Sequence, residues 1–160
     1  MTYDFNADEI FEMAEQIERN GASFYRRSAE SIAEPAEKKL LLDLAAMEEE
    51  HEKTFVDLRA GLSEKERFTT LFDPEGETAL YLQALADIRV FFEKKIDMSS
   101  MEEILKQAIL AEKDSIAFYL GMKEMVPVNS GKTKIDAIIK EEMAHIKLLG
   151  KELVALKKNA

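Results

Sequence analysis

The 160-residue chain contains no cysteine and no tryptophan, and it has only three prolines and six glycines. The absence of cysteine excludes a disulfide framework, thiolate zinc sites, iron–sulfur clusters and cysteine nucleophiles. Since proline and glycine are the residues that most often break helices, their scarcity favours helical structure. A chain of this length can bury a core as one domain without covalent cross-links.

Basic residues and long apolar runs are also lacking. Asp and Glu number 32 against 22 Lys and Arg, which gives a net charge of −10. An acidic chain repels phosphate backbones, so we do not expect nucleic-acid binding. No segment approaches the roughly 18 apolar residues of a membrane span, and residues 1–15 lack the basic start and apolar middle of a signal peptide. We therefore expect a cytoplasmic protein without a membrane partner.

Apolar residues recur at helical spacing along most of the chain, and no strand pattern is present. Asn6, three residues before Glu9, is a variant of the capping box, and the run Ser99–Glu103 repeats this pattern. A charged loop is expected after Gly61, with a turn at Asp73–Gly76. The predicted helices run from Asn6 to the break at Pro35, over about 36–60, over about 77–95, from Ser99 to Pro127 and over about 132–157.

The lengths of the connections predict how these helices are arranged. Few residues join the first two long helices, and few join the last two, so each pair forms an antiparallel hairpin. The connection between the hairpins has about 40 residues, enough to return the chain along a helix of about 37 Å. This predicts an all-α, ferritin-like four-helix bundle made of two duplicated helical hairpins with a long, partly helical crossover. We expect a single domain, 1–160, with hairpins 1–60 and 101–160 and crossover 61–100.

Both histidines of the chain follow a glutamate by three residues. The pairs are Glu48 with His51 and Glu142 with His145. Residues three apart lie on one face of a helix about one turn apart, so each pair could bind one metal ion.

A repeat connects these pairs to two further glutamates. The second pair follows the first by 94 residues, and the same offset relates Glu18 to Glu112. Each of these glutamates is followed at the same distance by a Phe–Tyr pair that ends in Tyr25 or Tyr119. The chain is therefore interpreted as a duplicated helical hairpin with an inserted crossover.

The repeated glutamates and histidines interrupt the inward apolar stripes of the four long helices. Buried carboxylates without a counter-charge are costly, and four glutamates balance two divalent cations. This predicts a dinuclear metal site, with a metal-free remnant of the duplication as the alternative. Tyr25 and Tyr119 either hydrogen-bond to ligand carboxylates or pack in the core. The predicted metal ligands are Glu18, Glu48, His51, Glu112, Glu142 and His145, and the four glutamates are also the candidate catalytic residues.

Other acidic residues near the motifs are expected to lie in solvent. These are Glu49, Glu50 and Glu141, beside the glutamates of the two pairs. Glu15 lies one turn before Glu18 and could be a further carboxylate of the site, but a surface position is favoured.

These residues resemble the rubrerythrin family of ferritin-like proteins, in the form of its diiron domain alone. The resemblance covers essentially the whole chain and includes the crossover run Tyr81–Leu85. It implies a non-haem diiron centre bridged by Glu48 and Glu142. Glu18 with His51, and Glu112 with His145, would complete it, and the sequence leaves open which pair serves which iron. It also implies reduction of hydrogen peroxide to water as the irons cycle between diferrous and diferric states.

Two features depart from that family. Typical members carry a rubredoxin-like iron site made of cysteines, so this chain needs a separate electron donor such as a rubredoxin-like protein. Ile109 stands where they have an additional glutamate, so the exchange of ligands during turnover is not carried over. The remaining set of four Glu and two His also resembles the ferroxidase centre of bacterioferritin.

We therefore expect a non-haem diiron oxidoreductase, a peroxidase that reduces hydrogen peroxide in oxidative-stress defence. The alternatives are a ferroxidase or iron-handling protein, and a non-catalytic metal-binding bundle. The expected cofactor is two iron ions, with manganese or mixed metals also compatible with these ligands. Hydrogen peroxide or dioxygen is the expected oxidant. Phe91 and Phe92 of the crossover suggest a homodimer.

Overall fold

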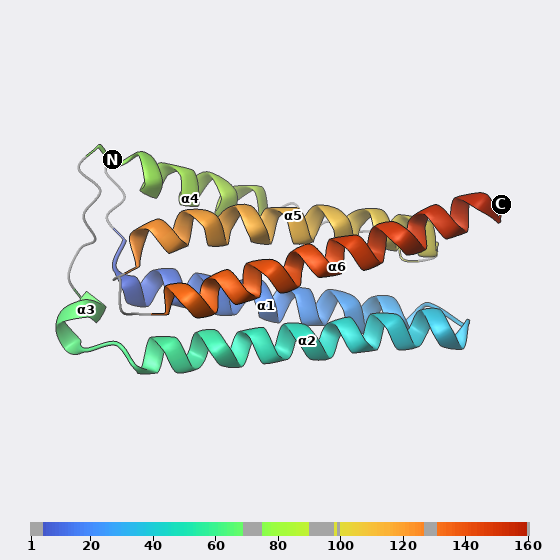
Figure 1. Cartoon of the computed structure of the whole chain (residues 1–160), viewed down its shortest axis with the longest axis horizontal. Coiled ribbons are helices and arrows are strands. Elements are labelled where there is room, and N and C mark those ends of the chain that lie inside the picture. Colours follow the sequence, from blue (N-terminus) through green and yellow to red (C-terminus); the bar gives the residue numbers. More distant parts are fainter. Residues whose placement is uncertain (1–4, 69–74, 90–97, 99, 127–130, 160) are drawn as a thin grey trace.

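The computed structural model describes residues 5–68, 75–89, 98, 100–126 and 131–159. Within these ranges the chain is helical and contains no strand (Figure 1). The helices are α1 (Ala7–Glu30), α2 (Pro35–Ala60), α3 (Glu64–Phe68), α4 (Glu77–Arg89), α5 (Met101–Met125) and α6 (Lys132–Lys158).

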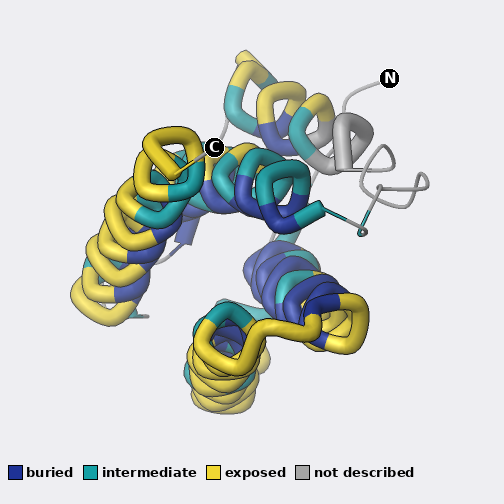
Figure 2. The backbone as a smooth tube through the Cα atoms, turned by 90° about the vertical axis from the view of Figure 1, so that its right-hand side faces the viewer, coloured by how far each residue is buried: buried dark blue, intermediate teal, exposed yellow. Residues whose placement is uncertain are grey.

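Four long helices form the bundle that the sequence predicts. As Figure 1 shows, α1 and α2 form one antiparallel hairpin, α5 and α6 form the other, and α4 lies along α5. The buried residues of the four helices face one another in the end view of Figure 2. The all-α bundle of two hairpins with a partly helical crossover is therefore confirmed.

A side-chain cap begins both α1 and α5. The Asn6 side chain accepts a hydrogen bond from the Glu9 backbone N–H at 2.8 Å, and the Glu9 carboxylate accepts one from the Asn6 N–H at 3.0 Å. Ser100 Oγ accepts a bond from the Glu103 N–H in the corresponding way. Because these caps satisfy backbone donors that have no partner within the helix, they fix where each helix begins. Ser100 follows Asn6 by 94 residues, so the repeat extends to the helix starts.

The short helix α3 corrects the expectation of a loop after Gly61. Ser63 Oγ accepts a hydrogen bond from the Glu66 N–H, and the Glu66 carboxylate accepts one from the Ser63 N–H. This capping box of Ser and Glu was readable in the sequence. Some of the expected features lie outside the described residues. These are the end of α4 near residue 95, Phe91 and Phe92, the first half of the turn at Asp73–Gly76, and the stop at Pro127.

Two apolar clusters fill the bundle on either side of its middle. One lies near the start of α1 and includes Phe11, Phe55 and Phe118. The other lies near the end of α1 and includes Phe24 and Leu41. The polar residues that the sequence singled out occupy the layer between the clusters. None of the described helices has the length and apolar character needed to cross a membrane.

Candidate metal centre

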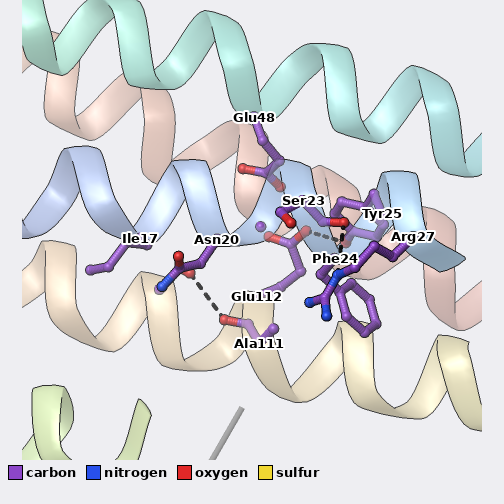
Figure 3. A pocket seen from close by; sticks show the side chains of 11 residues that line it. Ile17, Asn20, Ser23, Phe24, Tyr25, Arg27, Glu48, Ala111 and Glu112 are labelled. Atoms are coloured by element: carbon purple, nitrogen blue, oxygen red, sulfur yellow. Dashed lines mark hydrogen bonds between the residues drawn. The ribbon is translucent and has the colours of Figure 1, made fainter. Parts of the chain in front are cut away.

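The middle layer brings all six predicted ligands together from the four long helices. Each is at most 4% exposed. Glu18 comes from α1, Glu112 from α5, and each of α2 and α6 supplies a glutamate and the histidine one turn later. Glu48 and Glu112 also face a cavity beside α1 (Figure 3). Burial follows from the sequence pattern, since these residues occupy inward positions of otherwise apolar stripes.

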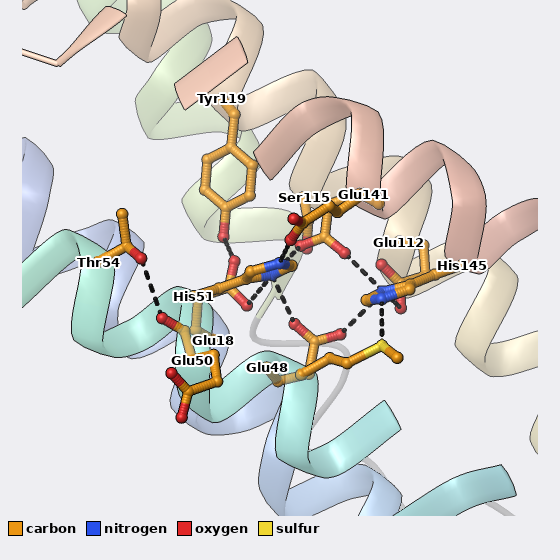
Figure 4. A network of polar contacts seen from close by, with 12 residues as sticks. Glu18, Glu48, Glu50, His51, Thr54, Glu112, Ser115, Tyr119, Glu141 and His145 are labelled. Carbon is orange, nitrogen blue, oxygen red and sulfur yellow. Dashed lines mark hydrogen bonds and ion pairs between the residues drawn. The ribbon is translucent and has the colours of Figure 1, made fainter. Parts of the chain in front are cut away.

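His51 and its neighbours form one group of potential ligands. Nδ1 of His51 lies 3.3 Å from Glu142 Oε1, 3.5 Å from Glu18 Oε2 and 3.7 Å from Glu48 Oε2 (Figure 4). The ligand atoms of these four residues all lie within 4.8 Å of one another.

His145 forms a second group of the same kind. Its Nδ1 lies 2.9 Å from Glu142 Oε2, 3.4 Å from Glu112 Oε1 and 3.6 Å from Glu48 Oε1. Glu48 and Glu142 thus belong to both groups and turn one oxygen toward each histidine. The structure places Glu18 beside His51 and Glu112 beside His145.

Several buried polar atoms of this layer lie at ion-pair distance from one another but form no hydrogen bond of suitable geometry. They are Oε2 of Glu18, both carboxylate oxygens of Glu142, and Nδ1 of His51 and of His145. Buried polar atoms in proteins are nearly always satisfied, so their convergence on two points needs an explanation. Carboxylate and imidazole donors suit divalent iron, manganese and zinc, so the residues present fit a pair of such ions.

The electrostatics of the cluster lead to the same conclusion. Burial, together with the adjacent Glu48, raises the pKa of Glu18 to about 8, and burial raises the pKa of Glu112 to about 7. Burial by itself lowers the pKa of His145, but the neighbouring carboxylates Glu112, Glu142 and Glu48 raise it to about 12. Without cations the layer therefore holds extra protons, and bound metal would replace them.

The two tyrosines link the repeated halves. Tyr25 Oη donates a hydrogen bond to Glu112 Oε1 at 2.6 Å, and Tyr119 Oη donates one to Glu18 Oε1. Each tyrosine therefore contacts the glutamate of the other half rather than the one seven residues before it. Both phenols are buried, so their hydroxyls orient these carboxylates.

The far side of each histidine ring has a partner that the sequence reasoning missed. Nε2 of His51 lies 2.5 Å from Glu141 Oε2, and Nε2 of His145 lies 3.2 Å from Met47 Sδ. Glu141 is exposed as expected, but it also orients His51. The signal was available, because Glu141 follows Met47 by the same 94 residues and each directly precedes a glutamate of the repeat.

The expected surface position of Glu15 is wrong. Glu15 is only 6% exposed, and its Oε2 accepts a hydrogen bond from Arg59 Nη1 at 3.1 Å. It does not belong to either group of ligand atoms. Arg59, from the last turn of α2, lies over this part of α1 and excludes solvent from the carboxylate.

The other expected surface glutamates lie at the rim of the layer. Glu50 is exposed and pairs with Lys53 at 2.7 Å. Glu49 is partly buried and pairs with Arg26. Ile109, which follows Glu15 by 94 residues, is partly buried and packs against the second apolar cluster.

A comparison with solved structures identifies the fold. The chain resembles a protein of Thermotoga maritima that is described as a ferritin-like diiron-carboxylate protein, with a TM-score of 0.71 and 22% sequence identity. The similarity covers 96% of this chain and 97% of that one. No protein-family model and no curated protein matches the sequence. The chain therefore has a ferritin-like fold with a buried cluster of carboxylates and histidines that could hold metal.

Proposed function

We propose that this protein is a diiron oxidoreductase of the rubrerythrin type that reduces hydrogen peroxide to water. The observation that carries the proposal is the pair of ligand groups that share Glu48 and Glu142. Two groups with two carboxylates in common are an arrangement suited to two adjacent metal ions rather than to one.

The proposed ligand roles follow from this geometry. Glu48 and Glu142 would bridge the two ions, Glu18 and His51 would complete one site, and Glu112 and His145 would complete the other. Two bound irons would supply Lewis acidity and, between them, the two electrons that reduction of one peroxide needs.

Neighbouring residues prepare the site for this chemistry. The hydroxyls of Tyr25 and Tyr119 hold the carboxylates of Glu112 and Glu18, and Glu141 fixes the ring of His51. The apolar clusters on both sides of the layer exclude bulk water. Because the chain contains no cysteine, the proposal requires a separate electron donor such as a rubredoxin-like protein.

A ferroxidase or iron-handling function is the second candidate. The near-symmetry of the two ligand groups supports it, since each has one unshared glutamate and one histidine. In that case Fe²⁺ is the substrate and dioxygen or peroxide the oxidant. The homodimer remains a prediction.

An anaerobic titration with Fe²⁺ tests the ligand assignment. We expect metal-free protein to bind about two ions per chain, and we expect Glu48→Ala and Glu142→Ala to lose this stoichiometry. Glu50→Ala is the matched control, because Glu50 lies on α2 beside the site but is exposed and pairs with Lys53. If a bridging variant kept both ions and full turnover, the assignment would be wrong.

Product analysis separates the candidate functions. A peroxidase consumes hydrogen peroxide catalytically with an external reductant. A ferroxidase consumes Fe²⁺ and leaves ferric product, and a non-catalytic bundle shows no rate advantage over free iron.

A further inference from the structure

A cavity of 320 Å³ lies between α1 and α5 and reaches the candidate metal centre. In Figure 3, Ile17 lies toward one end and Phe24 and Arg27 toward the other, with Glu48 and Glu112 between them. Arg27 follows Ile17 by ten positions in α1, so the cavity follows the helix for about 15 Å.

The cavity is larger than hydrogen peroxide requires. Peroxide has two heavy atoms, and a water molecule occupies about 30 Å³ in the liquid. The observed volume instead lies within the range of sites for small organic molecules, about 300–1,000 Å³. Its wall is apolar at Ile17, Phe24 and Ala111. The wall also carries polar and charged side chains, which are Asn20, Ser23, Tyr25, Arg27, Ser115 and the candidate ligands Glu48 and Glu112. The apolar side chains could contact the carbon skeleton of an organic molecule, and the polar groups could orient it.

In the other half of the repeat, α4 covers the region that corresponds to the cavity. Gly121 is the counterpart of Arg27, and α4 packs against it. A Cβ atom at Gly121 would lie 2.8 Å from Tyr81 Cε1, so glycine is required there for α4 to approach. The Tyr81 hydroxyl also donates a hydrogen bond to the Ala117 carbonyl at 2.9 Å. The crossover helix thus covers one side of the duplicated bundle, whereas the cavity occupies the other.

Gly21 keeps the inner end of the cavity next to Glu48. A Cβ atom at this position would lie 3.5 Å from Cδ and Cγ of Glu48, in van der Waals contact. Its counterpart in the repeat is Ser115. The absence of a side chain at Gly21 therefore leaves space beside a proposed bridging carboxylate.

We propose that this cavity binds a small apolar organic molecule, and that organic hydroperoxides are the substrates reduced at this centre. The second part rests on the proposed peroxidase function. In the overall reaction the O–O bond breaks and the hydroperoxide becomes an alcohol plus water. Two protons come from solvent, and two electrons come from an external one-electron reductant. The apolar part of the substrate would lie against Ile17, Phe24 and Ala111.

Binding can be tested without turnover. The probe is 2-phenyl-2-propanol, the alcohol formed from cumene hydroperoxide, titrated calorimetrically into the full chain loaded with Zn²⁺, which is redox-inert. We expect Ala111→Leu to weaken binding at least about tenfold, because the larger side chain fills part of the cavity. Ser23→Leu, at an exposed position of the cavity wall, is a second variant with little risk to folding. Ala155→Leu, at an exposed position of α6, is the matched control and should leave affinity unchanged.

Turnover of the iron-loaded chain then tests the substrate class. We expect kcat/KM for cumene hydroperoxide, divided by kcat/KM for hydrogen peroxide, to fall about tenfold in Ala111→Leu and to stay constant in Ala155→Leu. If the wild type reduces hydrogen peroxide but neither binds the alcohol nor reduces cumene hydroperoxide, the inference is wrong and the proposed function stands. If the alcohol binds with the expected dependence on Ala111 but no peroxide is reduced, the proposed function is wrong, and with it the substrate assignment.

Discussion

Arg59 joins the start of α1 to the end of α2, and its removal gives a sharp test of the structure. Its Nε and Nη2 donate to the two oxygens of Asp8 at 2.9 and 3.0 Å, and its Nη1 donates to Glu15 at 3.1 Å. The Asp8 and Glu15 side chains are 18% and 9% exposed. Nη1 of Arg67 in α3 donates to Asp8 Oδ1, the oxygen that also accepts from Arg59 Nε, at 3.1 Å. Asp8 therefore keeps one partner when Arg59 is replaced.

The expected loss of stability lies between the contribution of a surface ion pair and that of a fully buried one. An exposed pair contributes about 0–1 kcal/mol, whereas removing one partner of a fully buried pair costs about 3–5 kcal/mol. Arg59→Met keeps an unbranched side chain and good helix propensity while removing the charge and the donors. Glu15 would then be nearly buried without the cation that now pairs with it. We expect a loss of about 2–3 kcal/mol in the free energy of unfolding.

Urea denaturation followed by circular dichroism measures this loss. With an m-value of about 2 kcal/mol per M, the midpoint should fall by roughly 1–1.5 M. Lys39→Ala is the control, because the Lys39–Asp43 pair is exposed and should shift the midpoint by no more than about 0.3 M. A shift in Arg59→Met as small as that of the control would refute the reasoning.

The same variant should respond to pH in a defined direction. The hydrogen bonds from Arg59, helped by its charge and that of Arg67, lower the pKa of Asp8 below its ordinary value of 3.8. A carboxyl whose pKa is depressed in the folded state stabilises the protein above its unfolded pKa and loses that contribution as pH falls through the folded value. The difference in the free energy of unfolding between wild type and Arg59→Met should therefore have its complete value at pH 7 and decrease below about pH 4.

Three further outcomes are expected. Gly121→Ala should destabilise the chain by about 1–3 kcal/mol in urea denaturation, because its Cβ would meet the Tyr81 ring at 2.8 Å; an unchanged midpoint would contradict the packing of α4 on α5. Glu141→Gln should weaken metal affinity by about tenfold in competition with a chelator, since the carboxylate that orients His51 is lost; equal affinity would mean that this contact does not act on the site. Asn6→Ala should cost about 1 kcal/mol of stability through loss of the α1 cap, measured by thermal unfolding.

The helices and the candidate ligands were readable from the sequence because their signals are local. Helical spacing and the caps at Asn6 and Ser100 depend on residues a few positions apart. A glutamate within an apolar stripe, such as Glu18, also stands out without any knowledge of its neighbours in space. The repeat of 94 residues then connected the two halves and predicted that four glutamates and two histidines would converge. Even α3 had a local signal, the Ser63–Glu66 capping box, that was overlooked.

Contacts between helices depended on the tertiary structure. The sequence placed Glu15 on the surface because nothing within α1 covers it; the residue that does so, Arg59, lies 44 positions away. Likewise, the hydrogen bond from Tyr25 to Glu112 spans 87 positions and joins different hairpins.

The cavity and the closed side opposite it were also decided by the tertiary structure. A duplicated sequence predicts two equivalent faces, and the packing of α4 on Gly121 makes these two faces different. Helical period and capping are properties of neighbouring residues and survive in the sequence as patterns. Which side chain covers which carboxylate, and which face stays open, depends on how the helices pack against one another, and only the folded chain fixes that.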